Sequence, residues 1–270
     1  MQSSEKLEVN PNRIKYKGHH KFCTTFIHED ASAPPETFFK NFPKDMCFDM
    51  VSTQFSMHYM LSTEQKARNF FENVSQRLCN GGYFISTFPD ANVLMKKLRE
   101  TDQKDDKGRY FVENQYYSLI TETLKVDKNK GPYGHPYGFY LQDGLVGNYI
   151  EGEKEDMIEY VPEYLVILPN LIKIAKEYGL ELCETWNFHE FFARNITNEK
   201  YYRIFSRSMK FDVRGDSPLL MDADLWDVSY LYRVIAFKKV EGTEMNEVDR
   251  SLFKKISYYK LIKKKFDRKK

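Results

Sequence analysis

One segment of this 270-residue chain restricts its fold more than any other, namely residues 46–88. A strand is predicted at 46–55, and Gly81-Gly82 precedes a second strand at 83–88. Between them we expect a helix, with Ser62 and Gln65 as a capping box at its start and the glycine pair at its end. The apolar positions of this helix share one face: Ala67, Phe70, Phe71, Val74 and Leu78. A strand, helix and strand in this order are typical of a parallel α/β sheet with right-handed crossovers.

The remaining sequence continues the alternation of strands and helices. The nearly continuous apolar start of the strand at 46–55 predicts burial on both of its faces. Polar residues dominate from Thr101 to Tyr160, which we interpret as an insertion over the sheet. A helix is predicted from Pro162 to Tyr178, with Pro169 able to kink it. The other predicted elements are strands at 22–27, 116–121, 137–142, 180–186 and 230–237, and helices near 34–43, 92–99 and 190–209.

The composition is that of a globular chain, because 41% of the residues are hydrophobic and 30% are charged. The length allows one large domain or two small ones. The formal net charge is only +2, so no global field draws the chain to nucleic acid. Positive charge is concentrated at residues 254–270, where nine Lys or Arg stand against Asp267. Such a run is typical of a solvated tail, and it can also contact phosphates.

The cysteine pattern favours free thiols. Cys23, Cys47, Cys79 and Cys183 form no CxxC pair, and no histidine lies at metal-ligand spacing from them. We therefore expect neither a zinc site nor a disulfide framework, and we expect a reducing compartment. No apolar run reaches the length of a membrane span, and no signal peptide is predicted.

Polar side chains follow three of the predicted strands. Asp30 comes after the first strand, residues 54–59 after the second, and Asp90 after the third. Ligands of open α/β sheets bind beyond the carboxyl ends of the strands, so the acid at the first end and the amide, imidazole and phenol at the second can converge on one pocket. Strand ends are polar in most proteins, however, and this pattern alone does not define a function.

The second of these strand ends belongs to a longer pattern. The segments, in chain order, are FDMVSTQFSMHY (48–59), NGGYFISTFP (80–89), YGFYLQD (137–143), VPEYLV (161–166) and YLYRVIAFK (230–238). Together they resemble the eukaryotic mRNA cap guanine-N7 methyltransferases. The similarity runs from Phe22 to Val240, with Asn80 in place of the family's proline. Any one segment would be suggestive, whereas the ordered set is specific.

This resemblance implies an α/β fold with a class I methyltransferase-like (Rossmann-like) sheet and a cap-side insertion. The methyltransferase domain would cover residues 22–241, between a polar lead-in at 1–21 and a basic tail at 242–270. The implied reaction moves a methyl group from S-adenosylmethionine to N7 of the 5′ cap guanine of pre-mRNA, in the nucleus. Implied partners are the capped 5′ end of mRNA, with an activating subunit or the transcription machinery as further candidates. Neither a membrane nor a metal is implied.

Three residues match the family's methyl-donor side. Asp30 matches the acid that accepts from the adenine amino group of S-adenosylmethionine, and Gln54 and Tyr59 match positions that line the donor. Guanine N7 already presents a lone pair, and the sulfonium donor is the activated partner. We therefore expect catalysis by positioning and electrostatics, without a nucleophile or an acid–base pair.

Three further residues match the family's guanine side, namely His58, Glu163 and Tyr232. A carboxylate at Glu163 can accept from guanine N1–H and the 2-amino group together, which adenine does not offer. His58 can donate to O6, and Tyr232 can give the base an aromatic surface. Structural explanations stay open, because an acid near a helix start, a polar residue at a strand end and a tyrosine in an apolar strand are all common.

The family's glycine-rich donor loop has no counterpart before Asp30, since Gly18 is the only glycine there. Two explanations compete. One is a partial sequence of an active enzyme, and the other is a catalytically inactive cap-binding or regulatory paralogue that has lost donor binding. In both cases we expect the strand that follows the missing segment to lose a sheet neighbour and to expose an unpaired edge. A small-molecule methyltransferase is disfavoured by the segments at 48–59 and 161–166.

Overall fold

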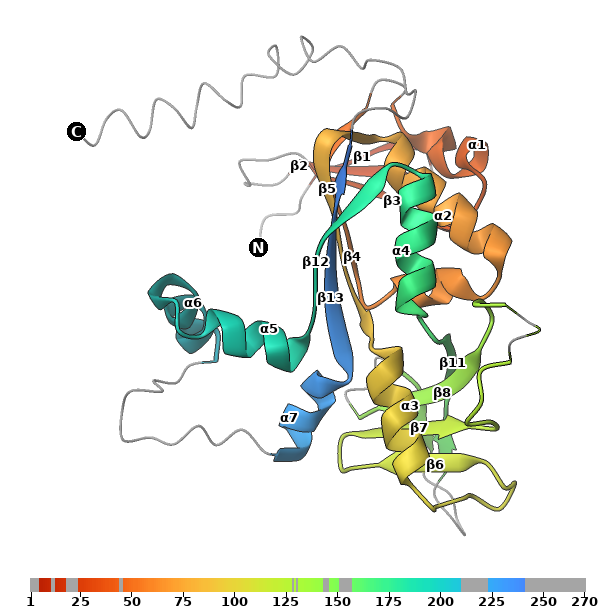
Figure 1. Ribbon diagram of the computed structural model, residues 1–270. Coiled ribbons are helices and arrows are strands. Elements are labelled where there is room, and N and C mark those ends of the chain that lie inside the picture. Colours follow the sequence, from red (N-terminus) through yellow and green to blue (C-terminus); the bar gives the residue numbers. More distant parts are fainter. Residues whose placement is uncertain are drawn as a thin grey trace.

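The computed structural model describes residues 5–10, 13–17, 24–43, 46–127, 129, 131–142, 146–150, 157–209 and 223–240. Its larger sheet has the strand order β12-β13-β5-β4 (Figure 1). The strands are β4 (Phe48–Gln54), β5 (Leu78–Pro89), β12 (Leu180–Asn187) and β13 (Tyr232–Lys239). β4 and β5 are parallel, as predicted, whereas β5–β13 and β13–β12 are antiparallel. The α/β class is confirmed, in a sheet of mixed direction.

Helix α2 (Glu64–Gln76) joins the two parallel strands and packs together with α4 (Leu168–Glu177) into the core beside the sheet (Figure 1). Four positions of its predicted apolar face are confirmed, because they lie in the helix and are buried: Ala67, Phe70, Phe71 and Val74. Leu78 is also buried but begins β5. The predicted cap is off by one residue. Thr63, rather than Ser62, is extended and accepts from the Lys66 amide at 3.2 Å.

The glycine pair does not end the helix, as we expected, but lies inside β5. Arg77 is the C-terminal cap of α2, and β5 begins at Leu78. The register against β4 shifts between Phe48 and Met50, and Gly81 takes a φ of 77° in this irregular stretch. A Cβ on Gly82 would meet the Asp49 carbonyl oxygen at 2.9 Å, so the close approach of the two strands requires glycine.

Strand β4 is not buried on both faces, which corrects the prediction from its apolar start. Its side chains alternate between half-buried and exposed, and Met50 is 55% exposed. β4 is the last strand of its sheet, and within the described residues no strand pairs with its outer edge. Within this part of the chain, the unpaired strand edge that we expected therefore lies at β4.

A second sheet occupies the predicted insertion, in the order β11-β8-β7-β6 and antiparallel throughout. Its strands are β6 (Tyr110–Glu113), β7 (Tyr117–Thr121), β8 (Pro136–Leu141) and β11 (Val161–Tyr164). Helix α3 (Ala91–Glu100), predicted at 92–99, packs on this sheet with Leu94 and Leu98 buried (Figure 1). A hairpin of β9 (Asn148–Ile150) and β10 (Met157–Glu159) lies between β8 and β11 in the chain.

The helix predicted from Pro162 to Tyr178 is wrong in its first half. Pro162 lies in β11, opposite Gly138 of β8. The helix begins only at Leu168, with Pro169 in its first turn. A proline there costs no hydrogen bond, because the first helical amides have no partner within the helix. Pro169 therefore starts α4 rather than kinking it.

The helix predicted at 190–209 is divided into α5 (Phe188–Asn195) and α6 (Glu199–Met209). Asn198 lies between them and accepts from the Lys200 amide at 3.0 Å, so its side chain starts the second helix. Helix α7 (Ala223–Tyr230) leads into β13. None of the helices in the described ranges is long and apolar enough to cross a bilayer.

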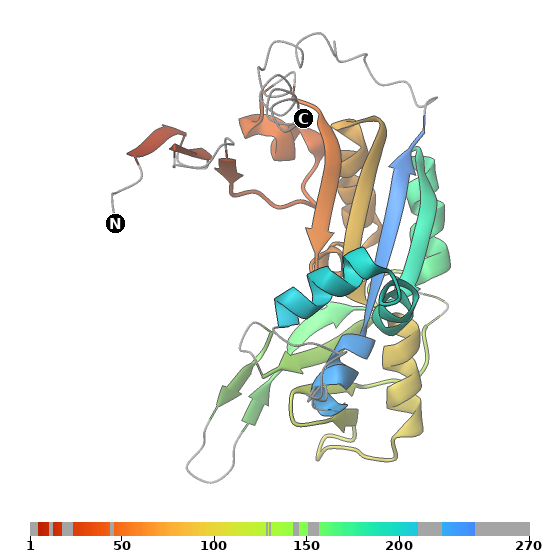
Figure 2. The same ribbon diagram turned by 90° about the vertical axis from the view of Figure 1, so that its left-hand side faces the viewer.

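The residues before Asp30 form a separate antiparallel sheet (Figure 2). It consists of β1 (Glu5–Asn10), β2 (Arg13–Lys17) and β3 (Thr24–Ile27), so two strands lie in the predicted polar lead-in. The short helices α1 (Pro35–Phe38) and η1 (Phe39–Asn41) follow, and η2 (Met57–Leu61) follows β4. The predicted tail at 242–270 lies outside the described residues.

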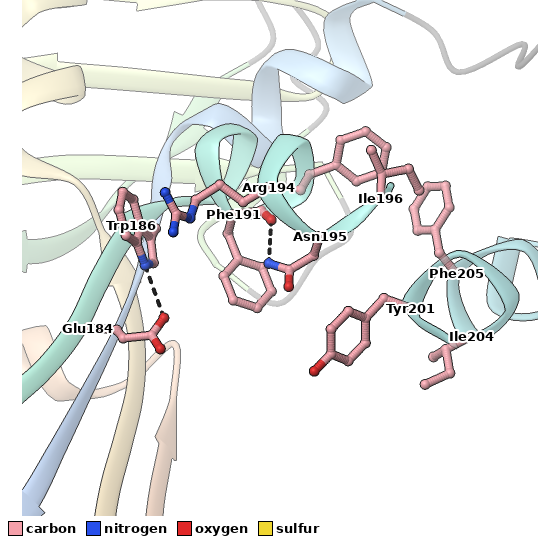
Figure 3. Close-up of a pocket in the computed structure, with 10 residues that line it drawn as sticks. Glu184, Trp186, Phe191, Arg194, Asn195, Ile196, Tyr201, Ile204 and Phe205 are labelled. Carbon is pink, nitrogen blue, oxygen red and sulfur yellow. Dashed lines mark hydrogen bonds between the residues drawn. The ribbon is translucent and has the colours of Figure 1, made fainter. Parts of the chain in front are cut away.

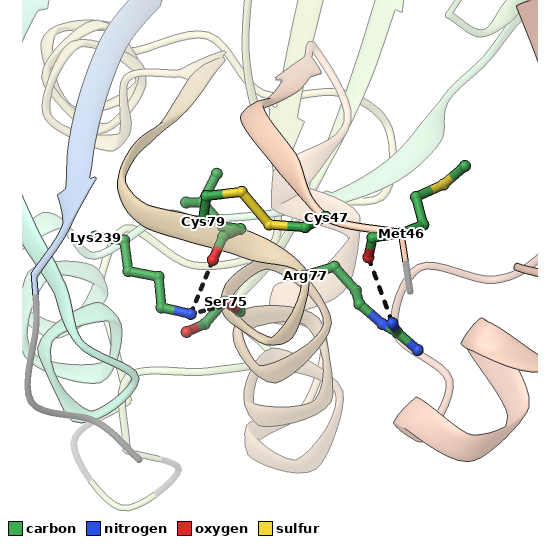
Figure 4. Close-up of a disulfide and its surroundings, with 7 residues drawn as sticks. Met46, Cys47, Ser75, Arg77, Cys79 and Lys239 are labelled. Atoms are coloured by element: carbon green, nitrogen blue, oxygen red, sulfur yellow. Dashed lines mark hydrogen bonds between the residues drawn. A yellow bond between two sulfur atoms is a disulfide. The ribbon is translucent and has the colours of Figure 1, made fainter. Parts of the chain in front are cut away.

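Two of the cysteines are joined, contrary to our expectation of free thiols. Cys47 and Cys79 form a disulfide with their Cα atoms 5.9 Å apart (Figure 4). They lie at the starts of neighbouring strands, since Phe48 pairs with Leu78. The sequence separation of 32 residues hides this proximity, which only the parallel pairing creates. Cys183 is free and exposed on β12.

Candidate functional site

A buried carboxylate lies at the centre of the candidate site. Glu163 is 2% exposed, and each of its two oxygens accepts from a phenol. Tyr59 Oη donates to Oε1 at 2.9 Å, and Tyr137 Oη donates to Oε2 at 2.6 Å. His58 Nε2 lies 3.2 Å from the same Oε1. We call these four residues the Glu163 cluster.

Three separate segments build the Glu163 cluster. Glu163 and Tyr137 stand directly opposite each other in the antiparallel β11–β8 pair, so their side chains share one face. His58 and Tyr59 come from η2, which turns away from the end of β4 and packs on β11. Met57 is fully buried in the core and anchors this turn. The carboxyl end of β4 is thereby joined to the second sheet.

Both phenols of the Glu163 cluster are held protonated. Burial, followed by the charge of Glu163 and the hydrogen bond to it, raises the pKa of Tyr59. The same causes raise the pKa of Tyr137 well above its usual value, with further contributions from Tyr232 and Tyr59. A buried carboxylate is costly unless it is hydrogen-bonded. The two neutral phenols supply that stabilisation as donors.

His58 is the polar group that the cluster does not satisfy. The residue is 2% exposed, yet neither ring nitrogen has a hydrogen-bond partner among the described residues. Nε2 is near Glu163 Oε1 but outside hydrogen-bonding geometry. The His58 ring instead lies 4.2 Å from the Tyr59 ring, centroid to centroid. Buried polar atoms without partners are rare, so the imidazole is available to a ligand.

Tyr232 belongs to an aromatic group beside this cluster. It lies on β13 and is 9% exposed, with its ring 4.9 Å from Phe55 in a T-shaped contact and 5.8 Å from Phe188. Phe55 directly follows β4, is 48% exposed and has a φ of 53°. That left-handed conformation is costly for a residue other than glycine. The Phe55 amide donates to the Thr87 carbonyl at 3.0 Å, which helps to hold it.

The two predicted donor-side residues outside the cluster make local hydrogen bonds. Gln54 is exposed at the end of β4, where its Oε1 accepts from Thr87 Oγ1 at 2.9 Å. Asp30 Oδ1 accepts from the Ser32 hydroxyl at 2.7 Å and the Ser32 amide at 2.8 Å. These bonds, the hydroxyl first, lower the pKa of Asp30. Asn73 of α2 donates to the Ala31 carbonyl at 2.9 Å and fixes the Asp30 loop to the helix.

Asp90, at the third strand end, has a structural role. It is 3% exposed, caps α3 through the Asn92 amide at 3.1 Å, and accepts from Arg233 Nε at 2.9 Å. This ion pair joins the end of β5 to β13 next to Tyr232. Asp90 is therefore engaged by α3 and β13 within the protein. The cluster unites only His58, Tyr59 and Glu163 of the six predicted residues, and their roles stay predictions.

Sequence reasoning missed two features of this region. Tyr137 lay within a quoted segment but received no role, although its position opposite Glu163 follows from pairing the two segments in an antiparallel register. Phe55 was likewise unassigned. Among the described residues, no group of three or more His, Cys, Asp or Glu side chains is arranged to hold a metal ion.

A separate cavity of about 930 Å³ lies between the end of β12, α5 and α6 (Figure 3). Trp186 forms one wall, with the Arg194 guanidinium 3.9 Å from its ring centroid. Phe191, Tyr201 and Ile204 line the cavity and are exposed. No pattern in the sequence indicated this hollow, since it depends on the angle between two helices that were predicted as one.

Comparison with known proteins gives a consistent result. Residues 8–240 match the model of the mRNA (guanine-N(7))-methyltransferase domain. The mRNA cap guanine-N(7) methyltransferase of Cryptococcus neoformans is 36% identical over 73% of this chain and 28% of its own. The corresponding proteins of Oryza sativa and Saccharomyces cerevisiae are 36% and 35% identical, over 48% and 42% of their own lengths. The chain thus spans less than half the length of these relatives.

Proposed function

Because this chain belongs to the mRNA (guanine-N(7))-methyltransferase family, we propose that the Glu163 cluster binds the cap guanine of mRNA. We propose further that the protein takes part in transferring a methyl group from S-adenosylmethionine to N7 of that guanine. The observation that carries the proposal is a buried carboxylate beside a buried imidazole whose ring nitrogens have no hydrogen-bond partner among the described residues.

The hydrogen-bonding groups of the cluster are complementary to guanine. The base presents two donors side by side, N1–H and the 2-amino group, with the O6 acceptor next to them. Glu163 can accept both donors, which is a charge-assisted and bidentate pattern. His58 can donate to O6 from the ring nitrogen that carries the proton. Adenine has an acceptor at N1, an amino donor at position 6 and only C–H at position 2, so the same cluster would reject it.

An aromatic surface next to the carboxylate supports the same proposal. Phe55 and Tyr232 contact each other edge to face, and Phe55 keeps nearly half of its surface open. A base held by Glu163 can stack or make edge contacts on such rings, which typically contributes about 1–3 kcal/mol. The backbone strain at Phe55 fits a residue that is held in place for binding.

The residues on the donor side fit S-adenosylmethionine in their chemistry. The carboxylate of Asp30 is ionised and exposed, and so can accept from an adenine amino group. Gln54 and the Tyr59 ring would line the donor at the end of β4. When bound, the donor supplies the methyl group as an activated sulfonium. The chain's own contribution is to orient guanine N7 and to exclude water, since N7 needs no base.

Calorimetry with the full 270-residue chain separates this function from its alternatives. We expect binding of the unmethylated cap analogue GpppA, binding of S-adenosylmethionine, and methylation of capped RNA. Cap binding without donor binding would favour a catalytically inactive cap-binding or regulatory paralogue. Donor binding without cap binding would overturn the guanine site and favour a small-molecule substrate.

The nuclear location and the RNA contacts belong to the same proposal. The family's substrate is mRNA, and nine Lys or Arg at residues 254–270 supply positive charge for phosphates or a localisation signal. An activating subunit or the transcription machinery would then be the protein partner. If the tail contacts phosphates, deleting residues 254–270 will reduce the salt dependence of RNA binding, whereas an unchanged slope excludes such contacts.

A further inference from the structure

We propose that Tyr137 is the positioning residue that fixes the Glu163 carboxylate, so that the site distinguishes guanine from a base without the 2-amino group. This inference rests on the proposed function and deepens it. Tyr137 would act on the base only through Glu163, and its substitution would change selectivity rather than the methyl-transfer step.

The hydrogen bond from Tyr137 restricts the orientation of the Glu163 carboxylate. Its 2.6 Å bond to Glu163 Oε2 is shorter than the 2.9 Å bond from Tyr59 to Oε1. The terminal torsion of a glutamate is broad, so the carboxylate plane needs external donors to be fixed. Tyr137 is itself immobilised, because it is 3% exposed and packs with Leu165 and Tyr232 in the hydrophobic core beside the second sheet.

The number of acceptor sites matches the edge of guanine. An ionised carboxylate offers about four lone-pair sites, two on each oxygen. One phenol occupies one site on each oxygen. Each oxygen therefore keeps one site, and guanine presents two donors. With Tyr137 bound to it, Oε2 keeps one acceptor site for one of the two guanine donors. We assign that donor to the 2-amino group. Oε1 lies beside His58, and it therefore faces the O6 side of the base.

The phenol keeps this role over the whole physiological pH range. Burial and the charge of Glu163 raise the pKa of Tyr137, so the hydroxyl stays protonated and donates. An ionised phenol would repel the carboxylate instead. Tyr160, which directly precedes β11, provides a matched control, because its hydroxyl bonds to Ser118 at 2.9 Å rather than to Glu163.

The test compares the affinity of the full chain for GpppA and for IpppA, whose inosine lacks only the 2-amino group. A hydrogen bond to a charged group contributes about 1.5–3 kcal/mol, so we expect the wild type to prefer GpppA by roughly tenfold to a hundredfold. Tyr137→Phe should reduce this preference at least fivefold, and Tyr160→Phe should leave it unchanged. In a Glu163→Gln background, Tyr137→Phe should add no further loss of selectivity.

Each outcome separates the two proposals. If the wild type binds neither analogue, the proposed guanine site fails. If it prefers GpppA, and Tyr137→Phe keeps that preference, the site stands and the role of Tyr137 is overturned. Thermal unfolding reports the fold of each variant. 4-Fluorophenylalanine at position 137 fills the space of the hydroxyl without donating, and 4-aminophenylalanine restores a donor. The 4-fluorophenylalanine variant should lose the preference for GpppA, and the 4-aminophenylalanine variant should recover it. An equal preference in the two variants would also overturn the role of Tyr137.

Discussion

The Glu163 cluster and the β4 edge lie at the two sides of the same turn, yet they differ in how their polar groups are satisfied. Glu163, His58 and Tyr137 are 2%, 2% and 3% exposed. On the β4 edge, by which we mean β4, Phe55 and the Asp30 loop, Met50 is 55% and Phe55 48% exposed. The cluster is held by bonds between distant segments, whereas Gln54 and Asp30 bond to nearby strands or to their own turn.

Under the proposed function, this difference corresponds to two kinds of binding site. The cluster is preorganised, because both phenols already orient the carboxylate, and a ligand there pays little for ordering the side chains. Within the described ranges, the outer edge of β4 pairs with no strand, and Met50 on its face is exposed. Under the proposed function, guanine recognition would depend on buried residues of the described chain. Donor binding would instead use a surface that is open in the described residues.

The largest effect is expected from removal of the central carboxylate. Glu163→Ala should lower the affinity for GpppA at least a hundredfold, because two charge-assisted hydrogen bonds of about 1.5–3 kcal/mol each are lost. Calorimetry measures the change. Glu113→Ala is the control, since Glu113 is an exposed acid on the same sheet. An affinity within threefold of the wild type would place guanine elsewhere.

The second prediction concerns alkaline pH. Burial raises the pKa of Tyr137, so its phenol ionises in the unfolded chain before it does in the folded one. Its contribution is complete below pH ~10 and is lost as the pH rises further, by about 1.4 kcal/mol per unit. In denaturant titrations between pH 9 and 11, the free energy of unfolding of Tyr137→Phe should fall less steeply with pH than that of the wild type. Parallel curves for the two proteins would contradict a protonated, buried phenol.

The β4 edge should behave in the opposite way. The Ser32 hydroxyl and amide lower the pKa of Asp30, so its stabilising contribution is present above the usual value and is lost as the pH falls through the lowered one. NMR titration of the Asp30 carboxyl measures this directly, with Ser32→Ala as the variant that should move the pKa back towards normal. Asp30 is exposed, so the accompanying change in stability should be small.

The sequence sufficed for the α/β class and for most elements, because long apolar patterns are local. The face of α2 and the strand predicted at 230–237, which is observed at 232–239, are examples. The sequence did not predict the features that depend on pairing between distant segments. Pro162 was predicted to start a helix, yet it lies in a strand because it pairs with β8. The Cys47–Cys79 disulfide likewise depends on the register between β4 and β5. Glu163 and His58 could be named from the resemblance, whereas the two phenols on Glu163 required the tertiary structure.

The fourth prediction separates strain from contact at Phe55. Its left-handed backbone costs about 1–3 kcal/mol, which glycine would relieve, and its ring contact with Tyr232 contributes about 0.5–1.5 kcal/mol. Phe55→Gly should therefore change the free energy of unfolding by only about 1 kcal/mol, while cap affinity falls about tenfold with the lost ring. Phe55→Ala loses the ring and keeps the strain, so denaturant unfolding should show it to be less stable than the glycine variant. Equal stability would mean that the backbone is relaxed.

The smallest effect is expected on the outer face of β4, and it tests the comparison most directly. Met50 is more than half exposed, so Met50→Lys should change the free energy of unfolding by less than about 0.5 kcal/mol. Val51 points the other way and packs against the core, so Val51→Lys should cost several times more, since it buries an unpaired charge. Denaturant unfolding of the two variants gives the ratio. A large cost at Met50 would mean that something covers this edge in solution, and the β4 edge would then be as closed as the Glu163 cluster.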